Sequence, residues 1–199
     1  MLPQQDRKIK IIVRFILTNM KKEERVFELF LNSPTKHWHF QDICDSASIS
    51  KPQASSWLTK FIKLGLVKKI KQNGKMPYYV SDYSNPYYQA KKKIYSLEML
   101  EQQGFLGHLA GLQKAKAVVI FGSFSRWDWH KDSDIDLFIY GNPEGLEKDR
   151  FRAKLHREIQ VFVCRTKEDL KNFSQGLLKN IAEGYRVKGA LDFIEVANA

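Results

Sequence analysis

Two aspartates stand in an otherwise apolar stretch, Asp134 and Asp136 in DIDLFIY. Side chains alternate between the faces of a strand, so a strand here places both carboxylates on one face, about 7 Å apart. Ile135, Leu137 and Ile139 then face a core. An ionised carboxylate in an apolar setting is costly unless a positive group pairs with it. Hard oxygen ligands of this kind suit Mg²⁺ or Mn²⁺, so the pair indicates a divalent metal site.

A Gly-Ser turn precedes this pair by ten residues. Residues 116–121 (KAVVIF) form an apolar run that predicts a buried strand, and Gly122 and Ser123 follow it where a short helix is expected. The free N–H groups at a helix N-terminus favour phosphate, and glycine lets the backbone approach closely. A phosphate cradle beside metal-binding carboxylates describes a site for a metal-bound nucleoside triphosphate.

The pattern of an apolar strand, Gly-Ser, ten residues and then Asp-x-Asp resembles the nucleotidyltransferase superfamily of DNA polymerase β, in particular its minimal nucleotidyltransferase branch. The resemblance covers residues 116–165 well and the C-terminal helices loosely. It implies transfer of a nucleoside monophosphate from an NTP, with ATP the expected one, to a hydroxyl, with release of pyrophosphate. It also implies that Gly122 and Ser123 hold the triphosphate and that Asp134 and Asp136 hold Mg²⁺ or Mn²⁺ ions.

The family usually has a third carboxylate on a later strand, which helps to bind the catalytic metal and to deprotonate the acceptor hydroxyl. On the predicted strand 158–165, Glu158 is the only acid on the polar face, so it is the expected third catalytic and metal-binding carboxylate. Gln160 could equally be a substituted Asp, which would leave a site that binds nucleotide but transfers poorly. Arg126 occupies the place of a frequent family arginine and is expected to touch phosphate, with a surface salt bridge to a loop Asp as the equal alternative.

The N-terminal half predicts helices over residues 22–32, 41–47 and 51–64, after a short one at 9–20. Ser50 is a natural N-cap for the third helix, and Pro52 fits its first turn. The residues that recur at helical spacing and are expected to face inward are Ala54, Trp57, Leu58, Phe61 and Ile62. A hairpin follows, with strands 66–71 and 78–81 around an Asn-Gly turn.

Three helices and a basic hairpin resemble the winged helix-turn-helix transcription regulators, over residues 22–82. The resemblance implies that one face of the third helix enters the major groove of double-stranded DNA and that the hairpin tip 72–75 contacts a flanking backbone or minor groove. The expected DNA-binding residues are Lys51, Gln53, Ser55, Ser56, Lys60 and Lys75. Such modules also serve in protein docking or dimerisation, which is the alternative.

The net charge of +11 lies mostly in this part, because residues 1–83 carry 15 Lys and Arg against seven Asp and Glu, a net charge of +8. Such a balance favours polyanions, nucleic acid above all, as partners. No run reaches the roughly 18 apolar residues that cross a bilayer, and the N-terminus lacks the apolar core of a signal peptide. Cys44 and Cys164 lie far apart, so neither a disulfide framework nor a zinc site is expected. A reducing cytoplasm fits.

The sequence thus predicts an α+β protein with three parts. These are a winged helix-turn-helix domain at 1–83, a linker helix within 84–110, and a nucleotidyltransferase domain at 111–199 with a small mixed sheet and helices at 146–155, 167–183 and 188–196. The KKK run at 91–93 is expected to be a solvated face. Trp127 and Trp129 are expected to pack against the linker, with stacking on a base as the alternative.

Two functions from different classes remain. The leading one is a Mg²⁺-dependent nucleotidyltransferase coupled to a DNA-binding winged helix, with a protein or RNA hydroxyl as acceptor. Minimal nucleotidyltransferases are similar to antitoxins that adenylylate a partner toxin, so a toxin partner and a homodimer fit, whereas a membrane does not. The alternative is a transcription regulator whose nucleotidyltransferase fold only binds nucleotide or oligomerises.

Overall fold

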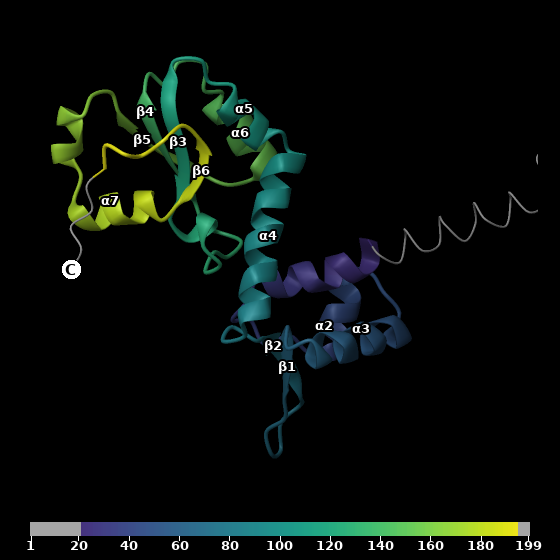
Figure 1. Cartoon of the computed structure of the whole chain (residues 1–199). Coiled ribbons are helices and arrows are strands. Elements are labelled where there is room, and N and C mark those ends of the chain that lie inside the picture. Colours follow the sequence, from purple (N-terminus) through teal and green to yellow (C-terminus); the bar gives the residue numbers. More distant parts are fainter. Residues whose placement is uncertain (1–20, 195–199) are drawn as a thin grey trace, which may run out of the picture. The chain divides into compact units, whose positions relative to one another are not determined.

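The chain divides into two compact units, Met1–Tyr88 and Gln89–Ala199 (Figure 1). The computed structural model describes residues 21–194, so the helix expected at 9–20 lies outside the described residues. Helices and two separate sheets are present, which agrees with the expected α+β class. Within residues 21–194, the helices are all too short or too polar to cross a bilayer.

In the first unit, a helical segment over residues 21–32 is followed by two further helices and a hairpin. Their bounds are α2 (Phe40–Ala47), α3 (Lys51–Lys63), β1 (Val67–Ile70) and β2 (Tyr78–Ser81). The two strands pair antiparallel, as the Asn-Gly signal predicts, and Gly74 adopts the left-handed φ of 73° in the turn. Trp38, in the short extended piece before α2, bridges to Tyr79 of β2.

The helix α3 begins where its N-cap predicts. Ser50 and Gln53 form a capping box, in which each side chain bonds to the other residue's backbone N–H. Leu58 and Phe61 are buried, whereas Ile62, expected inward, is 39% exposed. That expectation is wrong because Ile62 lies about 100° further around the helix than Phe61, which takes the buried position.

The second unit is built on a four-stranded mixed sheet of order β5-β4-β3-β6, in which β4 and β5 are parallel and the other pairs antiparallel. Its elements are α4 (Pro86–Gln102, which starts within the first unit), α5 (Phe105–Ala110), β3 (Ala115–Phe121), η1 (Ser123–Ser125), β4 (Ile135–Gly141), α6 (Lys148–Leu155), β5 (Ile159–Cys164), η2 (Glu168–Asn172), α7 (Gln175–Ala182) and β6 (Tyr185–Lys188). The mixed sheet expected from the sequence is confirmed.

Helices cover both faces of this sheet. On one face, Phe121, Phe138 and Cys164 pack in a buried cluster with Ile181 of α7. On the other side α5 and α6 lie together, with the rings of Phe105 and Phe151 4.9 Å apart (Figure 1). Because side chains alternate along β4, Asp136 shares the α7 face with Phe138.

Three helix predictions are wrong in detail. The linker helix expected within 84–110 is two helices, α4 and α5, since Gly104 takes a left-handed φ of 74° between them. The helix expected at 167–183 is the short η2 followed by α7. The described part of 188–196 contains no helix, and the preceding residues instead form β6, an edge strand that gains its backbone partners from β3.

Candidate functional site

The candidate residues of the second unit meet at one end of the sheet. In the strand register Asp136 of β4 lies between Phe121 of β3 and Gln160 of β5. Gly122 directly follows β3, and Asp134 directly precedes β4. The Gly-Ser turn and both aspartates, more than ten residues apart in sequence, are therefore brought together as the pattern predicts.

Gly122 could not be replaced by a residue with a side chain without disturbing this arrangement. Its φ of 71° and ψ of −155° belong to a region open almost only to glycine. A Cβ built on Gly122 would lie 2.1 Å from Oδ2 of Asp136. The carboxylate thus packs directly over the glycine backbone.

The helix expected after Gly122 is a single 3-10 turn of three residues, Ser123–Ser125. A helix of one turn has few free N–H groups, so phosphate binding by Gly122 and Ser123 stays a prediction. The turn is held locally, because Ser125 Oγ donates to the carbonyl of Gly122 at 3.0 Å. Any anion here would rest on the backbone of the turn and on the Ser123 hydroxyl.

The two aspartates have different surroundings. Burial raises the pKa of Asp136, the nearby Asp134 raises it further, and Arg126 opposes the shift. Asp134 accepts a hydrogen bond from Nε2 of Gln160 at 2.7 Å. A cation would stabilise the ionised form of Asp136, which burial and the neighbouring Asp134 disfavour.

A divalent cation fits this donor set. Mg²⁺ is commonly bound by one or two carboxylates together with water and substrate phosphates, and the repulsion between Asp134 and Asp136 supplies the reason to bind one. Within residues 21–194, no cluster of three or more His, Cys, Asp or Glu side chains surrounds a common point. A metal held here would depend on phosphate and water for its remaining ligands.

Glu158, the expected third carboxylate, lies immediately before β5 and pairs with Arg152 at 3.7 Å. Its side chain is 62% exposed. Glu158 and Asp134 both line a cavity of about 590 Å³ between the start of β4 and α6. The residue in register with Asp136 is Gln160, which carries no charge. The role of Glu158 stays a prediction.

Arg126 follows the 3-10 turn and forms a two-point contact with Asp128, with Nε and Nη2 lying 3.2 and 3.1 Å from the two carboxylate oxygens. This is the loop salt bridge that was the alternative to phosphate contact. The positive charge of Arg126 still acts on the site, because it lowers the pKa of Asp136. A phosphate contact by Arg126 would compete with Asp128.

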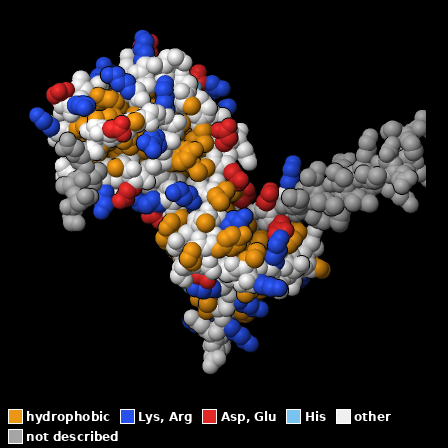
Figure 2. All heavy atoms as spheres, in the orientation of Figure 1, with side chains coloured by type: hydrophobic (Ala, Val, Ile, Leu, Met, Phe, Trp, Pro, Cys, Tyr) orange, Lys and Arg blue, Asp and Glu red, His pale blue; other side chains and the backbone are white. Residues whose placement is uncertain are grey.

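The candidate DNA-binding residues of the first unit lie on α3 and the hairpin. Lys51, Ser55, Ser56 and Lys75 are exposed, whereas the side chain of Gln53 takes part in the capping box. Lys60 pairs with Glu23 at 2.6 Å. In the view of Figure 2, Lys and Arg side chains are spread over the surface with Asp and Glu among them.

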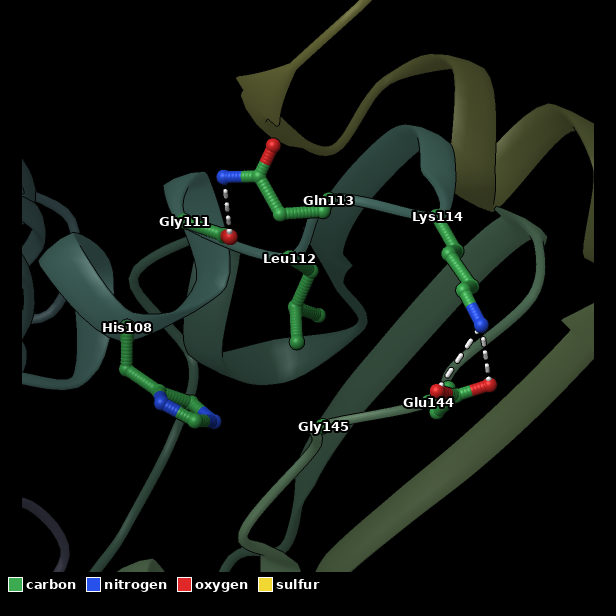
Figure 3. A pocket seen from close by; sticks show the side chains of 7 residues that line it. All are labelled: His108, Gly111, Leu112, Gln113, Lys114, Glu144 and Gly145. Atoms are coloured by element: carbon green, nitrogen blue, oxygen red, sulfur yellow. Dashed lines mark hydrogen bonds and ion pairs between the residues drawn. The ribbon is translucent and has the colours of Figure 1, made fainter.

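A second cavity of about 430 Å³ lies by the loops that join α5 to β3 and β4 to α6 (Figure 3). Lys114 Nζ points across it to Glu144, 2.9 and 2.8 Å from the two carboxylate oxygens. His108 Nε2 accepts from the backbone N–H of Glu147 at 3.1 Å. These polar groups are hydrogen-bonded, and the residues that line the cavity do not include any of the candidate site.

Two buried cations beside the site were missed. Lys92, the middle residue of the KKK run that was expected to be solvated, is 0% exposed, and Arg157 is 8% exposed. Both lie against Trp129, which packs on Tyr95 of α4 as expected for this tryptophan. A helical-wheel reading of α4 could have placed Lys92 inward with Tyr88 and Ser96, four residues before and after it.

Comparison with known proteins finds a similarity within the second unit. Residues 108–187 match the family model described as Polymerase beta, Nucleotidyltransferase. Over these residues the second unit is therefore similar to nucleotidyltransferases of the polymerase β type, and the match includes all the candidate residues of that unit.

Among solved structures, the chain is similar to a crystal structure described as a mutant of the toxin-antitoxin MntA-HpeT. The sequences are 14% identical, the TM-score is 0.31, and the likeness covers 49% of this chain and 73% of that chain. Comparison with curated proteins finds no match.

Proposed function

We propose that the second unit is a Mg²⁺-dependent nucleotidyltransferase that moves a nucleoside monophosphate from an NTP, ATP first among them, to a hydroxyl acceptor. The observation that carries this proposal is the packing of Asp136 over Gly122 with Asp134 beside it, within the matched residues 108–187. A phosphate-sized anion on the turn would then lie next to two carboxylates that would hold a divalent cation.

In this proposal each residue has a distinct task. Gly122 and Ser123 bind the triphosphate through backbone N–H groups and the hydroxyl, and Asp134 and Asp136 would hold the divalent cations. Divalent cations, when bound, neutralise the phosphate charge and lower the pKa of the acceptor hydroxyl. The acceptor oxygen attacks the α-phosphorus, the bond to the β-phosphate breaks, and pyrophosphate leaves with the electron pair.

The acceptor is proposed to enter through the cavity of about 590 Å³ that Asp134 and Glu158 both line. A hydroxyl in this cavity would lie between Asp134, a proposed metal ligand, and Glu158, which can accept its proton. Glu158 is the proposed proton acceptor, for which it must leave its contact with Arg152.

The test uses α-labelled ATP, MgCl₂ and extract of the cells that make the protein. The wild-type chain should transfer label to a macromolecule, and Asp134→Asn with Asp136→Asn should lower the transfer about 10³-fold. The matched control is Asp149→Asn on α6, whose side chain is 86% exposed. Nucleotide binding without any transfer by the wild-type chain would contradict the proposal.

One observation favours a second function, a regulator that binds the nucleotide without transferring it. Gln160 lies in register with Asp136 and holds Asp134 with an uncharged amide. An amide cannot accept the proton of the hydroxyl, and it adds no negative charge for a metal. Binding of Mg²⁺-ATP that shifts DNA affinity, with no labelled product, is the outcome expected of this regulator.

For the first unit we propose binding to double-stranded DNA through α3 and the hairpin. Lys51, Ser55 and Ser56 are exposed together on α3, and Lys75 lies by the hairpin tip. A mobility shift on duplex DNA should weaken steeply with added salt, because each lysine set against a phosphate releases counterions. An affinity independent of salt would contradict the phosphate contacts.

A further inference from the structure

The loop that connects η1 to β4 ends directly before Asp134 and so determines where Asp134 lies in the site. Residues 126–133 form no regular element, yet Trp129 at their centre is fully buried. Buried backbone carbonyls need hydrogen-bond partners. Here the carbonyls of Trp129, His130 and Ser133 receive them from two cationic side chains, Lys92 and Arg157.

Arg157 makes two of these contacts. Its Nη1 donates to the carbonyl of His130 at 2.8 Å and to that of Ser133, the residue before Asp134, at 2.9 Å. The guanidinium also lies 4.9 Å from the ring centre of Phe124 and 5.4 Å from that of Trp129. Arg157 therefore ties the end of the loop to the start of β5.

Lys92 makes the third contact from α4. Its Nζ donates to the carbonyl of Trp129 and lies 4.6 Å from the centre of the Trp129 ring. Burial lowers the pKa of Lys92 to about 8, with Asp128 raising it and Arg157 lowering it. Burying two cations around one tryptophan is costly compared with an apolar contact, so packing alone does not account for them.

We propose that Lys92 and Arg157 are positioning residues, which hold residues 129–133 and thereby fix Asp134 where it can bind a metal ion. This inference rests on the proposed function of the second unit. Neither side chain is assigned a contact with the nucleotide or the metal. Their effect passes through the backbone, because the carbonyl that Arg157 binds belongs to the residue joined to Asp134.

The experiment compares Lys92→Met and Arg157→Met with matched controls at exposed positions. Lys93→Met changes the neighbouring lysine of α4, and Arg150→Met removes an arginine that pairs with Glu147 on α6. Two readouts are taken on the full chain without nucleotide. They are the amide hydrogen exchange of residues 127–134 and the affinity for Mn²⁺ alone.

We expect exchange in this loop to become at least about tenfold faster in both test variants and Mn²⁺ affinity to fall about tenfold, with both controls unchanged. Asp134→Asn should lose Mn²⁺ binding while the loop keeps its protection, which separates the ligand from its support. Arg157→Lys, which retains a cationic donor, should recover part of both readouts. If Arg157→Met does not fold, Arg157→Lys compared with wild type tests the same contacts.

Two results would overturn the inference. Loop exchange that is unchanged in Lys92→Met and Arg157→Met would show that these residues do not hold the loop. Faster exchange with unchanged Mn²⁺ affinity would show that the loop does not position Asp134. A wild-type chain that binds no Mn²⁺ would overturn the proposed function itself and the inference with it, so the two failures are distinguishable.

Discussion

The two units hold their candidate residues in different ways. On α3 of the first unit, Lys51 and Ser55 point into solvent from a regular helix. At the sheet end of the second unit, Gly122 touches Asp136, whose pKa depends on Asp134, which in turn is held by Gln160. Effects of separate surface residues should add, whereas those of contacting residues should not. Substitutions in each unit test this contrast.

Gly122→Ala should have the largest effect. The new methyl group would meet Oδ2 of Asp136 at 2.1 Å, at a φ of 71° that L-residues rarely adopt. We expect transfer to fall about 10³-fold and the free energy of unfolding to fall by about 1–3 kcal/mol. Gly107→Ala in α5 is the control, because a Cβ there meets nothing within 4 Å. Labelled transfer and chemical denaturation measure the two effects. If Gly122→Ala and Gly107→Ala gave the same transfer rate and the same free energy of unfolding, Gly122 and Asp136 would not be coupled.

Glu158→Gln tests whether the coupled site includes the acid at the cavity. Loss of a proton acceptor should lower transfer about 10²-fold while leaving Mn²⁺ affinity nearly unchanged, since Glu158 pairs with Arg152 rather than with the aspartates. Steady-state transfer and metal titration measure the two effects separately.

The companion variant is Gln160→Glu, which places a carboxylate of the same length beside Asp134. It should tighten Mn²⁺ binding about tenfold through the added charge. Should Gln160→Glu raise transfer while Glu158→Gln leaves it unchanged, the third acid belongs to the position of Gln160, and Glu158 has no part in the reaction.

A pH series tests the buried charge that supports the coupled site. Because Lys92 has a pKa of about 8 in the folded chain against 10.5 for an ordinary lysine, the unfolded chain binds more protons between these values. Stability should therefore rise with pH across this window. The free energy of unfolding of wild type relative to Lys92→Met should increase by about 2 kcal/mol from pH 7.5 to 9.5.

Chemical denaturation at the two pH values measures this difference, with Lys93→Met as the control that should show none. The charged neighbours of Lys92 are Asp128 on the loop and Arg157 before β5. If the difference in free energy of unfolding did not change with pH, burial would not lower the pKa of Lys92. Lys92 would then titrate as a solvent-exposed lysine does, and the contrast with the exposed residues of the first unit would not hold at this position.

The contrast also explains what the sequence could predict. The start of α3, the hairpin and the placement of Asp134 and Asp136 follow from local signals, namely a cap, an Asn-Gly turn and strand alternation. The strand β6 was missed because its four residues gain their partners only from β3, far away in the chain.

Lys92 and Arg157 were missed for a related reason. Composition assigns a lysine run to solvent. Helical spacing alone favours an inward Lys92, but its contact with Trp129, and that of Arg157 with the same ring, join segments far apart in the sequence. Patterns of residue type thus predicted the residues proposed to touch substrate. The residues that hold them depend on contacts between distant segments.

The smallest effects are expected in the first unit. Lys51→Ala should weaken DNA binding about fivefold and reduce the slope of log affinity against log salt by about one, because one phosphate contact is lost. Lys60→Ala should change the slope less, since its ammonium already pairs with Glu23 at 2.6 Å. Mobility shifts at several salt concentrations measure both slopes. If the two residues act independently, the change in binding free energy of the double variant should be the sum of the two single changes. A double variant that loses far more than this sum would mean that the residues of α3 are coupled as well. The contrast between the two units would then fail.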